Sequence, residues 1–71
     1  MTGTDRTLLK ALVTEVITSI DEGKDVSMSI HPTCEGGIGV HVSFPDKIMV
    51  WAVGKSYCDR VEDIFTALEQ L

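Results

Sequence analysis

The chain has 71 residues, 44% of them hydrophobic, and its 11 acidic and 6 basic side chains give a formal net charge of −5. A chain of this length builds one small core, and its longest apolar run, Ile48 to Val53, is far shorter than the roughly 20 residues of a membrane-spanning helix. The negative charge disfavours nucleic acid and anionic lipid as direct partners, because both attract clustered Lys and Arg. A basic partner fits this charge, and so does a plain role in solubility.

The first residues, Met1 to Arg6, lack the basic and then apolar segments of a secretory signal. We therefore expect a cytoplasmic protein. Its two cysteines are then expected to be reduced thiols.

Apolar residues recur at helical spacing between Leu8 and Ile20, with Thr4 as a candidate N-cap and Gly23 as a left-handed stop. This pattern predicts a helix over about residues 5–22. Three strands are predicted to follow, because apolar and polar residues alternate in the first two and the third is continuously apolar. Their expected bounds are about residues 26–31, 38–44 and 48–53.

A second helix is predicted over about residues 57–70, with Ser56 as its N-cap. Its apolar stripe includes Tyr57, and Cys58 falls in its first turn. The acids of this helix lie on the face opposite the stripe, and the first helix adds two acids on its outer face. These six candidate partner-binding residues are Asp59, Glu62, Asp63, Glu69, Glu15 and Glu22.

The order helix, strand, strand, strand, helix covers residues 1–71 as one domain. Short connections favour antiparallel neighbours, so the predicted class is α+β, with a three-stranded antiparallel sheet flanked by two helices.

The side of the sheet on which Trp51 emerges depends on the turn before the third strand. If this turn pairs Phe44 with Ile48, Trp51 shares a face with His41. Either one helix then crosses to cover that face, or Trp51 belongs to an exposed patch. With one helix on each face of the sheet, we expect a monomer.

Four side chains have transition-metal character, namely His31, Cys34, His41 and Cys58. Only His31 and Cys34 have the spacing of paired zinc ligands, and nothing in the sequence couples a thiol to a histidine base. Helix-start acids beside Cys58 oppose thiolate formation. We therefore predict no metal, no cofactor and no catalytic residue, and the alternative is a thiol or metal enzyme built from these four side chains.

The acidic helix faces are then the leading candidate site. Carboxylates one to two helical turns apart, about 5 to about 11 Å, imitate the phosphate spacing of a nucleic-acid backbone. The alternative is an ordinary solvated face.

In size, acidity, element order and lack of an enzymatic motif, the chain resembles the anti-CRISPR proteins of phages, above all those directed at type I effector complexes. The resemblance implies a non-enzymatic inhibitor in the cytoplasm of a bacterial host. Such an inhibitor binds a basic DNA-recognition surface of a Cas subunit and competes with target DNA. Two alternatives are a small regulatory or antitoxin-like module, expected to dimerise, and a structural interaction domain; both would act through an apolar patch around Trp51.

Overall fold

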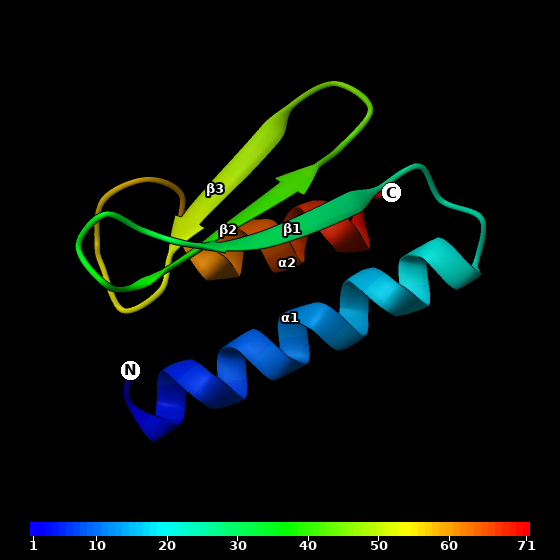
Figure 1. Cartoon of the computed structure of the whole chain (residues 1–71). Helices are drawn as coiled ribbons and strands as arrows, with labels where there is room; N and C mark the ends of the chain where they lie inside the picture. The colour runs from blue at the N-terminus through cyan, green and yellow to red at the C-terminus, as the bar shows by residue number, and fades with distance from the viewer.

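The computed structural model describes all residues from Met1 to Leu71 and confirms the predicted element order (Figure 1). A long helix precedes three strands, and a shorter helix follows them. The elements are α1 (Gly3–Asp21), β1 (Ser27–Pro32), β2 (Ile38–Ser43), β3 (Ile48–Ala52) and α2 (Val61–Glu69). Neither helix combines the length and the apolar character that a membrane-spanning segment requires.

The three strands form an antiparallel meander in the order β1-β2-β3, and both helices lie on the same face of this sheet (Figure 1). The expectation of one helix on each face is therefore wrong. The opposite face of the sheet carries the polar side chains of Ser29, His41 and Ser43 and has no helix over it. The expectation of a monomer depended on one helix covering each face, so it loses its basis.

The pairing of Phe44 with Ile48 is also wrong. The backbone N–H of Phe44 donates to the Lys47 carbonyl at 2.8 Å, which closes a two-residue turn and pairs Ser43 with Ile48. A shift of one residue moves a whole strand to the other face. Trp51 accordingly pairs with Val40 and faces the helices.

The core lies between the sheet and the two helices. Leu12 of α1, Val40 and Val42 of β2 and Ile64 of α2 have the largest fully buried side chains. Trp51 is only 3% exposed and packs in the same cluster, so it is a core residue and not part of an exposed patch. Burying a side chain of this size contributes a large share of the stability of so small a domain.

Helix α1 begins two residues earlier than predicted, because Thr2 and not Thr4 is its N-cap. Thr2 Oγ1 accepts the Asp5 N–H at 3.1 Å, and Asp5 Oδ2 accepts the Thr2 N–H at 3.2 Å. This capping box satisfies two backbone donors at the helix start. Gly23, with a φ of 82°, follows the helix as expected, and its N–H donates to the Ile20 carbonyl.

Helix α2 begins four residues later than predicted, at Val61, so neither the Ser56 cap nor a first turn at Cys58 is correct. Cys58 has a φ of 65°, which is incompatible with a right-handed helix, and it forms an isolated bridge with Trp51. Tyr57 is exposed and does not join the apolar stripe. The segment before α2 therefore follows the outer edge of β3.

Candidate functional site

Asp59 belongs to this segment and not to a helix face. Its Oδ2 accepts the Val50 N–H at 2.8 Å, and its own N–H donates to the Val50 carbonyl at 2.8 Å. Both backbone groups of Val50 at the outer edge of β3 are thus satisfied by one half-buried residue. The prediction that Asp59 belongs to an acidic helix face is wrong, because its carboxylate holds the sheet edge.

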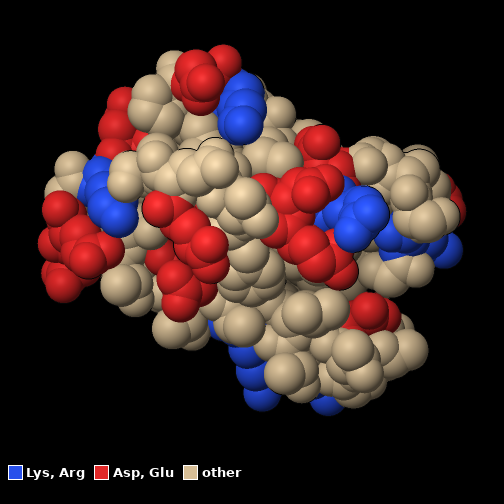
Figure 2. Space-filling model, turned by 180° about the vertical axis from the view of Figure 1, so that it is seen from behind, with Lys and Arg blue, Asp and Glu red and all other residues tan.

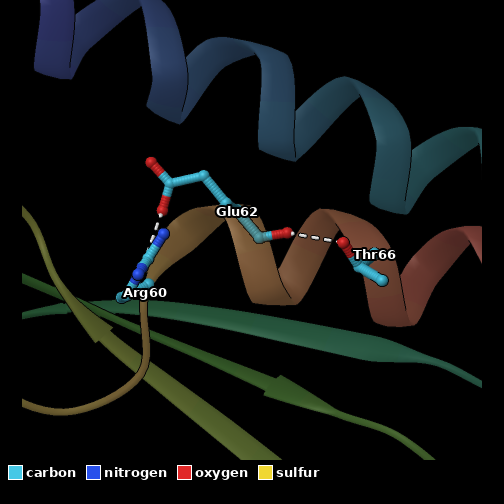
Figure 3. Close-up of polar contacts among 3 residues, drawn as sticks. All are labelled: Arg60, Glu62 and Thr66. Carbon is cyan, nitrogen blue, oxygen red and sulfur yellow. Dashed lines mark hydrogen bonds and ion pairs between the residues drawn. The ribbon is translucent and has the colours of Figure 1, made fainter.

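The other three predicted acids of α2 are on the helix and exposed. At 100° per residue, Glu62 and Glu69 share one side of α2, whereas Asp63 lies about 100° further round. Figure 3 shows the Glu62 side chain extending from α2 toward α1. Glu62 and Glu69 therefore face the same side as α1, and Asp63 is separate from them.

Glu62 has one basic neighbour. The Arg60 Nε lies 3.4 Å from Glu62 Oε2, and both side chains are mostly exposed (Figure 3). Such exposed pairs contribute at most about 1 kcal/mol, because water screens both charges. Arg60 can therefore exchange Glu62 for water or for another acid at little cost.

The two predicted acids of α1 lie on the flank of that helix that turns toward α2. The helix contacts α2 on one side and β1 on the other, and an apolar flank with Val13 and Ile17 faces β1. Glu15 and Glu22 lie on the opposite side of the buried stripe, and both are exposed. Glu22 has one basic neighbour, Lys24, whose Nζ is 3.6 Å from Glu22 Oε1.

Helical periodicity thus assigns four exposed acids to the adjoining sides of α1 and α2, with Glu22 at the C-cap of α1 and the other three within the helices. We call Glu15, Glu22, Glu62 and Glu69 the acidic flank. Seen from behind, acidic side chains form several groups across the surface, and basic side chains lie beside some of them (Figure 2). The arrangement offers fixed carboxylates on rigid helices, which suits electrostatic docking of a basic surface.

The histidines and cysteines are only partly brought together. The rings of His31 and His41 meet edge to face with centroids 4.5 Å apart. Gly39 makes room for the His31 ring, because a Cβ at that position would lie 2.9 Å from His31 Cε1. Cys34 and Cys58 are both free and exposed. No group of three or more His, Cys, Asp or Glu side chains is arranged to hold a metal ion.

A hydrogen bond joins two loops at one end of the sheet. The Tyr57 hydroxyl donates to Glu35 Oε1 at 3.1 Å, and this bond is the main cause of a raised Tyr57 pKa. Desolvation and the negative charge of Glu35 act in the same direction. Sequence reasoning missed this contact, because the two residues are 22 positions apart and neither lies in a regular element.

Sequence reasoning also missed an apolar groove between α1 and β1, with a volume of about 350 Å³. Helical spacing assigned its α1 residues to the core stripe, but Ile17 is 60% exposed and Ile30 of β1 is 49% exposed. Its six lining residues are Val13, Val16, Ile17, Ile20, Met28 and Ile30. The apolar residues of α1 cover a wider arc of the helix than one neighbouring surface can bury. This width is the sequence signal that could have revealed the groove.

Comparisons of the chain with protein-family models, with curated proteins and with solved structures found no match.

Proposed function

We propose that this chain is a non-enzymatic binding module whose acidic flank docks on a Lys- and Arg-lined surface of a protein that handles nucleic acid, and competes there with the nucleic acid. The observation that carries the proposal is the alignment of exposed carboxylates from α1 and α2 on one side of the molecule. Asp59, which holds the β3 edge, and Asp63, which lies apart, are not part of the proposed contact.

The spacing of these carboxylates supports the proposal. Glu15 of α1 and Glu22, the C-cap residue directly after this helix, are seven residues apart, and Glu62 and Glu69 are seven residues apart on α2. Seven residues span about 10.5 Å of helix, close to two full turns, so each pair lies on one side of its helix. Two neighbouring helices therefore offer the same charge repeat, as a surface that imitates a phosphate backbone requires.

The net charge of the whole chain also favours a basic partner. With a net charge of −5, the domain as a whole is attracted to a basic surface, and the acidic flank adds local orientation. The two basic neighbours of the flank, Arg60 and Lys24, form exposed pairs that a partner can replace.

The resemblance to anti-CRISPR proteins suggests which partner to try first. We propose a DNA-recognition subunit of a type I Cas effector, bound in the cytoplasm of a bacterial host. Inhibition by this route requires binding in a fixed ratio and no turnover, so a small domain with a rigid acidic face is sufficient.

The test measures association rates with a panel of purified Cas DNA-recognition subunits over a range of salt concentrations. The flank variant is Glu15→Lys with Glu69→Lys. The matched control is Glu35→Lys with Asp46→Lys, which changes net charge equally but in loops outside both helices. Added target DNA reports competition.

We expect the wild type and the control to bind, to associate more slowly as salt rises, and to be displaced by target DNA. At 0.1 M salt the Debye length of about 10 Å is comparable to the length of each glutamate pair, so screening should be strong. The flank variant should lose binding. A flank variant that binds like the wild type at every salt concentration would contradict the proposal.

A further inference from the structure

The two edges of the sheet differ in how their backbone groups are used. At the outer edge of β3, Asp59 binds both groups of Val50. Directly after β1, the N–H of Thr33 donates to the Gly37 carbonyl. Because hydrogen-bonded pairs alternate along an antiparallel ladder, the backbone N–H and C=O groups of Ser29 then point toward β2. The N–H and C=O groups of Met28 and Ile30 therefore point outward.

Nothing on β1 discourages another strand from pairing with this edge. The strand has no Lys, Arg, Asp or Glu, whereas natural edge strands are commonly protected by charge, by a bulge or by a covering segment. Its only protection is Pro32, at its last position. The apolar groove described above runs beside the same edge, with Ile17 and Ile30 exposed along it.

We propose that this edge and groove bind a second copy of the chain. The two copies are related by a two-fold axis through Ser29, so that β1 pairs antiparallel with β1 of the partner and two three-stranded sheets become one. The two α1 helices then pack side by side and cover each other's exposed Ile17.

The hydrogen-bond pattern selects the register. Pairing Met28 with Ile30 of the other copy uses every outward N–H of both strands. Moving the axis to Ile30 sets Met28 against Pro32, which has no N–H. Moving it to Met28 sets Ile30 against Val26, whose N–H already donates to the Lys24 carbonyl at 3.1 Å. Only the axis at Ser29 gives the outward carbonyls of both Met28 and Ile30 an N–H donor in the other copy.

The charges of α1 favour a second copy over an unrelated strand. Arg6 and Lys10 at the start of the helix and Asp21 at its end lie on the same flank as Ile17, and all three are exposed. None of them forms an ion pair within the chain. In the two-fold arrangement the helices are antiparallel, so the basic start of one lies near the acidic end of the other.

This dimer leaves the acidic flank accessible on both copies. The flank lies on the side of α1 that faces α2, and the proposed contact uses the side that faces β1. Dimerisation through β1 and binding through the acidic flank therefore do not depend on each other.

Symmetric cross-linking tests the axis directly. In a background with Cys34→Ser and Cys58→Ser, Ser29→Cys should form an intermolecular disulfide, because the Cα atoms of such a pair are about 4.5 Å apart, within disulfide range. Ser27→Cys is the matched control: it lies on the same exposed face of β1, but its counterpart is about 13 Å away along the strand. Cross-linking of Ser29→Cys alone supports the axis, and equal cross-linking or none overturns it.

Sedimentation over a concentration series tests the groove and the charges. Ile17→Glu should raise the dimer dissociation constant about 100-fold, because two buried carboxylates would face each other across the axis. Lys10→Glu and Asp21→Lys should each weaken the dimer about ten-fold, and the double variant should restore it. A wild type that is monomeric at every concentration, or a dimer that Ile17→Glu leaves unchanged, would overturn the proposal.

Discussion

The two flanks of α1 present opposite chemistry on one helix. The flank toward α2 carries the exposed carboxylates of Glu15 and Glu22, whereas the flank toward β1 carries the exposed side chains of Ile17 and Ile20. Between them, Leu12 is fully buried. A narrow buried stripe is enough to anchor the helix, so both flanks are free to differ.

With two unlike flanks on one helix, a chain of 71 residues can offer two separate surfaces. Because successive residues on a helix are 100° apart, a step of three or four positions keeps a side chain on its flank. Each flank can therefore be changed without touching the other or the core.

Removing the shared anchor should have the largest effect. Leu12→Ala deletes a fully buried side chain of α1, and we expect a loss of about 2–5 kcal/mol in the free energy of unfolding. Urea denaturation at a protein concentration below the dimer dissociation constant measures it, with Ile17→Ala as the matched control because Ile17 is mostly exposed in the single chain. Equal losses for the two variants would show that α1 has no distinct buried stripe.

Removing the Asp59 carboxylate from the outer edge of β3 should have the next largest effect. Asp59→Ala leaves the Val50 N–H without its carboxylate acceptor, and we expect a loss of about 1–3 kcal/mol. Asp63→Ala, on the exposed side of α2, should cost no more than about 1 kcal/mol. If both substitutions cost the same, the Asp59 contact does not stabilise the edge.

The sequence predicts those features of the fold that depend on residues close together in the chain. The element order and most of the core were predicted correctly, because periods of two and 3.6 residues are local signals. The start of α2 was predicted wrongly, because Asp59 binds Val50, nine positions earlier, and this bond competes with helix formation. No local pattern contains that contact.

The side on which Trp51 lies was missed for a related reason. One residue more or less in the turn after Phe44 reverses every side chain of β3, and composition does not decide the turn length. Of the candidate site, Glu15, Glu62 and Glu69 are exposed on helices as expected and Glu22 is exposed just past the end of α1, but the orientation of the two helices decides whether they share a side. That orientation is a tertiary property.

The smallest effect is expected at the Tyr57 and Glu35 contact, which is far from both flanks of α1 in sequence. Glu35→Gln should lower the raised Tyr57 pKa toward its ordinary value of 10.0, as measured by ultraviolet titration of the phenol. Because the pKa of Tyr57 is higher in the folded chain than in the unfolded chain, the contact stabilises the fold at pH values below the unfolded pKa. This stabilisation is lost as the pH rises through the folded pKa. Partner binding and dimerisation should not change. An unchanged Tyr57 pKa would show that the contact does not hold in solution.

The independence of the two flanks is tested most directly by measuring both associations on the same two variants. Glu15→Lys with Glu69→Lys should abolish binding to the basic Cas subunit while the dimer dissociation constant stays within about two-fold of wild type. Ile17→Glu should dissociate the dimer while each monomer still binds the subunit through its acidic flank. If either variant abolishes both associations while its unfolding free energy is unchanged, the two flanks of α1 do not act separately and the account is wrong.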